Sequence, residues 1–482
     1  MTYQPTIGLE VHVELKTKSK MFCSCKNDPN EKRPNFNICP TCTAQPGSLP
    51  VINKEAVRKV IKTGLALSCQ IPKYSKFDRK NYFYPDLPKG YQISQYDNPL
   101  CVGGFLDLAG KRIKITRVHL EEDTGRLIHP EGTDYSLVDF NRAGIPLMEL
   151  VTEPEITSAK EAREFAEVLQ LILRYLGVSA ADMEKGQMRV EANISITKTK
   201  KLGIKVEIKN LNSFRAVERG IDYEIERQSE LLKAGKKIIQ ETRGWNEVKG
   251  VTVSQREKEE AHDYRYFPEP DLPPLTHSKE LIEEIRAEIP ELPQERKERF
   301  KREYGLTEKE IEIFVSNKDL GEYFEKVVSE LPPRLSRENL SKLIKIVSNY
   351  LISDLLGLFK GSPFTEEGFL ITPENFAEFI VLIFEAKISS KIAKVLLAEM
   401  FKTGADPSHI IKEKQLIQIT DEKEIEKAIE EAINKNPKAV DDFNNGKETA
   451  LQYLIGQVMA ETKGKANPQL VNKLLKEGLT KI

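Results

Sequence analysis

Residues 6–15 read TIGLEVHVEL, a stretch in which apolar and polar side chains alternate. A period of two is typical of a β-strand with one buried face. The same period recurs in three later segments, residues 113–120, 188–196 and 203–210. These segments predict a sheet with one apolar face against a core and one face that carries polar side chains.

Helical patterns lie between the expected strands. The clearest span residues 158–176 and 216–234, and Thr157 or Ser158 is the candidate N-cap of the first. A proline-rich segment, residues 267–275, closes this region as a linker or an ordered extended strap. The pattern predicts an α+β fold with a mixed, largely antiparallel sheet covered by helices.

The rest of the chain is rich in Lys, Glu, Leu and Ile and predicts an all-helical region. Its helix-length segments are residues 338–357, 374–384 and 389–402. We divide the chain into three domains, a sheet domain at 1–293, a helical domain at 294–406 and a helical tail at 407–482. Residues 447–482 hold six lysines and three acids, which indicates either a phosphate contact or an ordinary solvated face.

Charge and hydropathy exclude several classes of protein. The chain of 482 residues has 73 Lys and Arg against 74 Asp and Glu, so no global field attracts nucleic acid or membrane. Its longest apolar stretch, residues 379–384, is far shorter than the roughly 20 residues that a membrane span needs. The N-terminus has neither an apolar signal segment nor an Arg-rich transit pattern. We expect a cytoplasmic protein that makes no membrane contact.

Four of the six cysteines form a CxC and CxxC pair near the N-terminus, at Cys23, Cys25, Cys39 and Cys42. In a reducing compartment this cluster favours tetrahedral Zn²⁺ over two disulfides or free thiols. Four thiolates leave no open coordination position, so such a zinc is structural. Cys69 and Cys101 stand among apolar residues, and we expect them in the core.

Common signatures of catalysis are missing from the sequence. It contains no GxGxxG, no GxxxxGK[ST] and no kinase HRD or DFG set, so any ATP binds to a less familiar scaffold. It also contains no HExxH, no GxSxG and no amidase-type Gly-Ser-Ser-Gly stretch. We therefore do not expect a hydrolytic Ser or Cys nucleophile.

Acidic side chains fall instead on alternating strand positions. Glu10 and His12 are two residues apart and project from one face of their strand, and His119 and Glu121 repeat that spacing. Other acids on or beside expected strands are Glu14, Glu122, Asp123, Glu149, Glu191 and Glu207. Several carboxylates and a His on one face suit Mg²⁺, which takes oxygen ligands and leaves positions for substrate phosphates. The alternative is ion pairing with Arg117, Arg142, Lys205 and Lys209.

An aromatic stretch, residues 77–95, contains five aromatic rings together with Arg79, Lys80 and Lys89. Such density indicates either a rigid loop that recognises a substrate or aromatic packing between subdomains. In the first case, Lys80 and Lys89 offer cations to a phosphate or carboxylate. Polar loops at 139–146 and 209–214 follow strands, where binding groups are often placed.

Nine segments, taken in order, closely resemble the GatB family, the B subunits of bacterial glutamyl/aspartyl-tRNA amidotransferases. They are IGLEVHVELKTKSKMFC, FDRKNYFYPDLPKGYQISQ, HLEEDTG, DFNRAGIPLMELV, ADMEKGQMRVEANIS, EIKNLNSF, QETRGWN, DYRYFPEPDLPPL and, in the tail, GQVMAETKGKANPQLVNKLL. The similarity runs essentially from end to end. It implies a cradle domain similar to the glutamine synthetase catalytic fold, then a helical domain and a YqeY-like tail that contacts tRNA.

The resemblance also implies an activity and partners. Members of this family work in a GatCAB heterotrimer, in which the amidase GatA hydrolyses glutamine to ammonia and the small GatC clasps GatA to GatB. This division of labour agrees with the missing amidase signature. The implied substrates are tRNA(Gln) charged with Glu and tRNA(Asn) charged with Asp. ATP with Mg²⁺ phosphorylates the side-chain carboxyl, and ammonia then displaces phosphate to give the amide.

Roles for individual residues follow from the same resemblance. The implied Mg²⁺ ligands are Glu10, His12, Glu121 and Glu149. Glu122 is placed at the end of the ammonia path as the group that takes a proton from ammonium, and Lys80 and Lys89 line that path or hold phosphate. The residues expected to bind ATP are Arg79, Tyr82, Asn141, Arg142, Glu207 and Lys209. The cysteine cluster, a feature that varies within the family, implies a structural zinc.

Two other functions compete with this interpretation. One is a non-catalytic tRNA-binding scaffold whose partner performs the chemistry. The acidic strand face argues against it, because a surface that meets RNA would not concentrate carboxylates. The other is a free-standing ligase of the glutamine synthetase type, which the tRNA-type tail disfavours.

Overall fold

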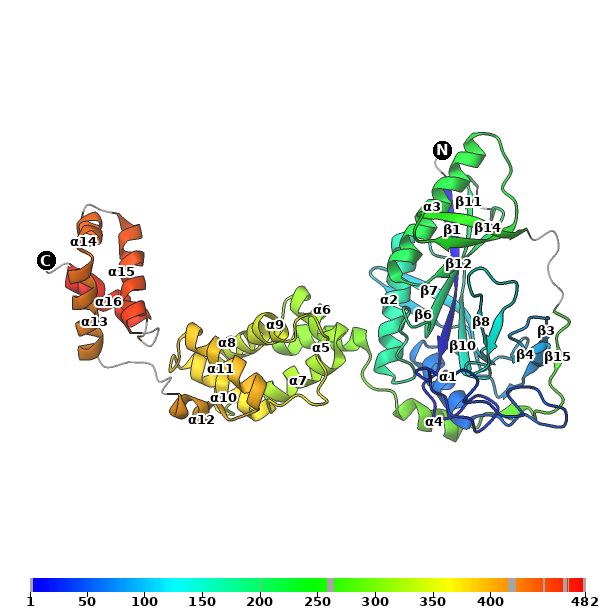
Figure 1. The fold of residues 1–482 in the computed structure, drawn as a ribbon, viewed down its shortest axis with the longest axis horizontal. Helices are drawn as coiled ribbons and strands as arrows, with labels where there is room; N and C mark the ends of the chain where they lie inside the picture. Colours follow the sequence, from blue (N-terminus) through cyan, green and yellow to red (C-terminus); the bar gives the residue numbers. More distant parts are fainter. Residues whose placement is uncertain are drawn as a thin grey trace. The chain divides into compact units, whose positions relative to one another are not determined.

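The computed structural model describes residues 3–199, 201–257, 264–414, 422–444, 447–462, 466 and 468–479. Contacts divide the chain into two compact units, Met1–Leu292 and Pro293–Ile482. The first is built on a large sheet and the second is helical (Figure 1). The α+β prediction is thereby confirmed, whereas the division into three domains stays a prediction.

The large sheet has nine strands in the order β14-β13-β12-β11-β1-β10-β7-β5, with β6 also paired to β7. Among the strand pairs of the described residues in this sheet, only β12 and β13 run parallel, so the sheet is mixed and largely antiparallel. Its strands are β1 Gln4–Glu14, β5 Cys101–Val102, β6 Phe105–Leu108, β7 Lys111–Glu122, β10 Pro146–Thr152, β11 Met188–Thr197, β12 Val206–Leu211, β13 Glu241–Asn246 and β14 Val251–Glu257.

One face of this sheet forms the core of the first unit. On β1 the apolar positions Ile7, Leu9, Val11 and Val13 are buried, while the polar residues between them are less buried. Three helices pack against the sheet, and α2 and α3 lie against each other along one side of it (Figure 1). They are α1 Lys54–Ala66, α2 Ala159–Tyr175 and α3 Phe214–Lys233. The opposite face of the sheet is left for polar side chains.

Short strands and the proline-rich segment complete the first unit. Residues 267–275 form an ordered strap, because both of its ends pair with short strands. Phe267–Pro268 pairs with Asp78 and Arg79, and Leu275–Thr276 pairs with Tyr74–Ser75. The small sheets comprise β2 Tyr74–Ser75 with β16 Leu275–Thr276, β15 Phe267–Pro268 with β3 Asp78–Asn81 and β4 Tyr91–Ser94, and β8 Arg126–Ile128 with β9 Leu137–Asp139. Helix α4, Lys279–Ala287, packs on α1. Cys69 and Cys101 are buried in the core, as predicted.

The second unit contains helices α5 to α16. The expected helix at 338–357 is interrupted, since a π-helical turn at Tyr350–Leu355 separates α8 from α9. The helices are α5 Pro293–Tyr304, α6 Glu308–Ser316, α7 Lys318–Ser329, α8 Arg337–Asn349, α9 Leu356–Leu358, α10 Pro373–Phe384, α11 Ser390–Thr403, α12 Pro407–Glu413, α13 Glu422–Lys435, α14 Pro437–Asn444, α15 Glu448–Glu461 and α16 Pro468–Leu479.

The last four helices share an apolar cluster of their own that includes Ile425, Leu454 and Leu475. Lys463, Lys465 and Lys481 of the lysine-rich stretch lie outside the described residues. None of the helices in the described ranges is long and apolar enough to cross a membrane.

Candidate active site

The polar face of the large sheet gathers acids from neighbouring strands. Antiparallel register places Glu149 of β10 opposite His12 of β1 on one side and opposite His119 of β7 on the other. On the other side of β1, Glu191 of β11 lies opposite Glu10. Directly opposed residues share a face of the sheet, so these side chains meet above it. They line a cavity of about 430 Å³, here called the acidic cavity.

His12 and Glu149, together with Glu121 of β7, form a mixed cluster in this cavity. Each offers one ligand atom, and the three atoms lie within 4.8 Å of one another. His12 Nε2 is 3.3 Å from Glu149 and 3.8 Å from Glu121. One nitrogen and two oxygens form a donor set that can hold a divalent cation with positions left for a substrate.

Glu10 belongs to a second, carboxylate cluster, with Glu191 and Glu207. Its carboxylate accepts a hydrogen bond of 2.7 Å from Asn193, and Lys209 contacts Glu191 at 3.0 Å. The structure thus separates Glu10 from the other three predicted Mg²⁺ ligands, because positions 10 and 12 of one strand meet different neighbours across the sheet. Glu207 and Lys209, predicted to bind ATP, lie at this cluster.

Electrostatics in the acidic cavity are dominated by burial and by the crowding of carboxylates. Burial raises the pKa of Glu10, and the neighbouring Glu149 and Glu191 raise it further. Burial alone would lower the pKa of His119, but the carboxylates of Glu149 and Glu121 outweigh it and raise that pKa to about 9. Burial disfavours ionisation of Glu149, yet the two histidines hold its pKa well below the usual range. The site therefore attracts positive charge, which a proton or a cation supplies.

Aromatic rings and a lysine form one wall of the acidic cavity. Lys80 Nζ lies 5.1 Å from the ring centroid of Tyr264 and 5.9 Å from that of Tyr82. Tyr96 stacks on Tyr266 with centroids 4.2 Å apart. Burial opposes a charge on Lys80, but Glu121 and other nearby groups raise its pKa above the usual range, so it stays a cation. Lys80 and Tyr82, which were both predicted to bind substrate or nucleotide, line this cavity.

Arg79 does not line the acidic cavity. It donates two hydrogen bonds of 2.8 Å to the buried Glu269 and stacks over Tyr91. Successive residues of β3 point to opposite sides of the strand, so Arg79 and Lys80 serve different surfaces. Arg79 therefore links β3 to the proline-rich strap through Glu269.

Glu122 and Lys89 meet on the far side of the sheet from Glu121. Lys89 Nζ lies 2.7 Å from the Glu122 carboxylate, which also accepts a bond of 3.0 Å from Ile93 N. Both line a second cavity of about 280 Å³, together with Cys23, Cys42 and several prolines. We call it the knuckle cavity. It is distinct from the acidic cavity because consecutive strand residues alternate between faces.

Asn141 and Arg142 hold a loop and line a third cavity. Asn141 accepts hydrogen bonds of 2.8 Å from Phe36 N and Asn37 N, and Arg142 donates to the carbonyls of Thr124 and Gly125. The third cavity, of about 550 Å³, is here called the charged cavity. Neither residue lines the acidic cavity.

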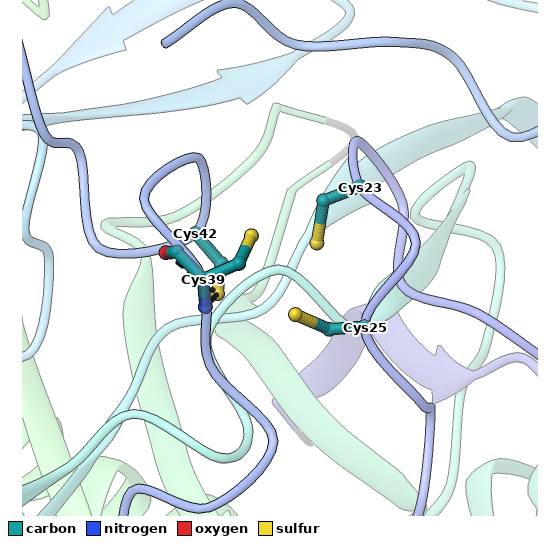
Figure 2. A group of neighbouring side chains, drawn as sticks. All are labelled: Cys23, Cys25, Cys39 and Cys42. Carbon is teal, nitrogen blue, oxygen red and sulfur yellow. Dashed lines mark hydrogen bonds between the residues drawn. The ribbon is translucent and has the colours of Figure 1, made fainter.

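The four clustered cysteines point their sulfurs toward a common centre (Figure 2). The ligand atoms lie within 4.8 Å of one another, and all the cysteines are free, so the disulfide alternative is not observed. A hydrogen bond from Cys23 lowers the pKa of Cys42 to about 5, and Lys20 acts in the same direction. Four convergent thiols with a thiolate among them fit tetrahedral zinc. We call this group the cysteine knuckle.

Several residues of the site had no individual binding or catalytic role assigned from the sequence. His119 and Glu191 were placed on the acidic strand face by their spacing, but not among the four named Mg²⁺ ligands. Arg189, Tyr264 and Tyr266 carry no such signal, since an arginine on a strand and tyrosines in a loop are common everywhere. Only the folded chain brings them to the acidic cavity.

Comparison with known proteins shows the family of the chain. Residues 5–283 match the model of the GatB/GatE catalytic domain, and residues 322–479 match that of the GatB domain. The chain is 51% identical to the B subunit of the aspartyl/glutamyl-tRNA(Asn/Gln) amidotransferase of Thermotoga maritima, over 99% of each chain. It is 50% identical to the protein of that name from Caldicellulosiruptor saccharolyticus, over 100% of both chains. The corresponding Carboxydothermus hydrogenoformans protein is 49% identical over 100% of this chain and 99% of its own.

Proposed function

Because the chain belongs to the GatB family of amidotransferase B subunits, we propose that it is the phosphorylating and amidating component of a tRNA-dependent amidotransferase. Its substrates are Glu attached to tRNA(Gln), Asp attached to tRNA(Asn), or both. A carboxylate resists attack by ammonia because oxide is a poor leaving group, so ATP first converts it to an acyl phosphate. Ammonia then displaces phosphate and leaves the amide.

The observation that carries the proposal is a pair of side-chain clusters above one sheet face, each with ligand atoms close enough together to hold a metal ion. Phosphoryl transfer needs positioning and neutralisation of charge rather than a protein nucleophile. The mixed cluster and the carboxylate cluster would each hold Mg²⁺, which supplies that neutralisation when bound. Their donor sets fit, since the neighbouring cationic groups hold Glu149 and Glu121 as carboxylates. Burial and neighbouring acids raise the pKa of Glu10, and a bound cation would offset that effect and favour its carboxylate form.

The other residues of the acidic cavity bind and orient the nucleotide. Lys80 and Lys209 are cations within reach of a triphosphate, and the rings of Tyr264 and Tyr266 offer stacking surfaces for adenine. The predicted contacts of Tyr82, Glu207 and Lys209 with ATP remain part of this proposal. Arg79, Asn141 and Arg142 do not line the acidic cavity, so their predicted contacts with ATP are not part of this proposal.

Ammonia arrives by the knuckle cavity, supplied by the amidase GatA, which the small GatC clasps to this chain in the cytoplasm. Glu122 takes the proton of ammonium and releases neutral ammonia toward the acyl phosphate. Lys89, 2.7 Å from that carboxylate, keeps it oriented. The cysteine knuckle would hold a structural zinc that shapes the wall of this cavity.

A matched pair of variants tests the proposal with the partner proteins of the heterotrimer present. Glu149→Gln keeps the shape of a mixed-cluster ligand but removes its charge, whereas Glu153→Gln makes the same change just beyond β10 and outside the acidic cavity. We expect Glu149→Gln to reduce ADP formation with misacylated tRNA by about 100-fold or more and Glu153→Gln to leave it nearly unchanged. Full activity of Glu149→Gln would instead favour the scaffold function.

A further inference from the structure

Three reactants must meet in the proposed reaction, and three cavities of the first unit lie near the end of β7. The acidic cavity holds both metal-binding clusters, and the knuckle cavity contains the Glu122–Lys89 pair. The charged cavity is the largest of the three and has no part in the proposed function above. Its lining residues indicate what it binds.

The charged cavity carries both signs of charge. Its cations are Arg126, Arg142, Lys185 and Arg189, and its acids are Glu14, Asp28, Glu31, Asp139 and Glu184. Among the residues that the structure describes, no three of these acids come close enough to hold a metal ion. A nucleoside triphosphate, which binds with metal, is therefore better matched to the acidic cavity. The charged cavity suits a ligand that has both a cationic group and phosphates.

Arg189 connects the two cavities, since it lines both. It stands on β11 directly opposite His12, so it reaches the polar face beside the mixed cluster. Its Nη2 donates to Asp123 at 2.6 Å, while its Nε is buried and has no acceptor among the described residues. A guanidinium has five N–H donors in a planar fork, so Arg189 has donors to spare for a carboxylate.

We propose that the charged cavity receives the aminoacylated 3′ end of the tRNA and that Arg189 binds the side-chain carboxylate to be phosphorylated. This inference rests on the proposed function and assigns the second substrate of the same site. The free α-ammonium of the aminoacyl ester meets the acids of the cavity, and Arg126 and Lys185 meet the phosphates of the RNA end. The Glu or Asp side chain of the ester then extends past Arg189 toward the mixed cluster, where the nucleotide is bound.

Asn212 allows the cavity to be blocked without disturbing the sheet. It is exposed and lies between the last residue of β12 and Ser213, the N-cap of α3. It lines the charged cavity and neither the acidic cavity nor the knuckle cavity. In the assembled complex, Asn212→Trp should raise the KM for misacylated tRNA by about tenfold or more and change the KM for ATP less than about twofold. Asn212→Ala is the control and should leave both constants near their wild-type values.

A KM for ATP that rises with Asn212→Trp while the KM for tRNA stays constant would overturn the assignment, because the nucleotide would then occupy this cavity. Unchanged constants for both substrates would overturn it as well. A wild-type complex that makes no ADP with misacylated tRNA would instead remove the proposed function itself. The two failures are thus distinguishable.

The role of Arg189 has its own readout, the difference in affinity between charged and uncharged tRNA. The wild-type complex should bind misacylated tRNA more tightly than the same tRNA without an amino acid, and Arg189→Gln should bind the two equally. Arg126→Gln is the control, since it should weaken both complexes by the same factor. Arg189→Gln with an intact preference for charged tRNA would contradict the proposed carboxylate contact.

Discussion

Glu149 is the residue on which the mixed cluster depends, because it lies 3.3 Å from both His12 and His119. The two-residue period of the strands predicted that Glu10 and His12 share a face, and they do. The period could not predict which acids come from which neighbouring strand. That information lies in the strand order and register, which placed Glu10 with Glu191 and His12 with Glu149.

The raised pKa of His119 predicts a pH dependence of metal binding. The folded-state pKa of about 9 exceeds that of an unfolded histidine, so protonation stabilises the folded protein at low pH and this contribution is lost as the pH rises through about 9. The imidazolium also repels a cation at the mixed cluster. The affinity for Mg²⁺ should therefore rise from neutral pH to about 9, by at most about tenfold per pH unit for one proton released.

Calorimetric titration with Mg²⁺ at several pH values measures this dependence. The control is His119→Asn, whose Mg²⁺ affinity should change less with pH than that of the wild type. A Mg²⁺ affinity that is independent of pH would contradict the placement.

Glu122 makes a second prediction at the residue scale. It faces the knuckle cavity and not the metal clusters, so Glu122→Gln should impair delivery of ammonia more than phosphorylation. We expect ADP formation with misacylated tRNA to continue while amide formation falls by about 100-fold, since proton transfer supplies roughly that factor. Parallel assays of ADP and of amidated tRNA measure the ratio. Equal losses of both products would place Glu122 in the phosphorylation step instead.

Among the elements, strands and long helices were the most predictable. Ser158 caps α2, accepting a hydrogen bond from Glu161 N, as one of the two candidates predicted. The segment at 203–210 begins as a strand only at Val206, and Leu202 and Ile204 are exposed. An alternating pattern does not show whether a residue pairs with a neighbouring strand, so the predicted start of the strand at residue 203 was wrong. The π-helical turn at Tyr350–Leu355 likewise leaves no mark in the spacing of apolar residues.

The cysteine knuckle is a loop element whose order should depend on metal. Cys39→Ser removes one of four ligands, so we expect bound zinc to fall from about one ion per chain to a small fraction. The loop should then lose protection against proteolysis, because metal binding and local folding are coupled. Metal analysis and limited proteolysis measure these effects, and Cys69→Ser, at a buried core thiol outside the knuckle, is the control for zinc content. Normal zinc content in Cys39→Ser would show that the knuckle is not the metal site.

At the scale of the whole molecule, the near-equal totals of 73 Lys and Arg and 74 Asp and Glu do not mean that charge is evenly distributed along the chain. Acids gather in the acidic cavity of the first unit, and a tail cavity of about 460 Å³ is lined by Lys435, Lys438 and Lys447. The sequence indicated either a phosphate contact or a solvated face for residues 447–482, and Lys447 of that stretch lines the tail cavity together with the earlier Lys435 and Lys438. It could not identify which lysines share a surface, because they come from different helices and loops.

Lys438 provides the test of this tail surface. Its charge should contribute to attraction for tRNA phosphate, so Lys438→Gln should weaken tRNA binding uniformly among tRNAs and reduce the salt slope by about one. The control is Lys427→Gln, which removes a lysine of α13 that does not line the tail cavity. Binding measured over a range of salt concentrations gives both quantities, and the KM for ATP should not change. An unchanged salt slope would leave the tail without a phosphate contact at this position.

In the proposed reaction the side-chain carboxylate becomes an acyl phosphate, and the fate of its oxygen tests this step most directly. Misacylated tRNA labelled with oxygen-18 in the side-chain carboxylate would be amidated by the assembled complex with ATP and glutamine. The carboxylate oxygen that attacks phosphorus leaves with the phosphate, so we predict one labelled oxygen in inorganic phosphate for each amide formed. Amide formation with unlabelled phosphate would contradict the account.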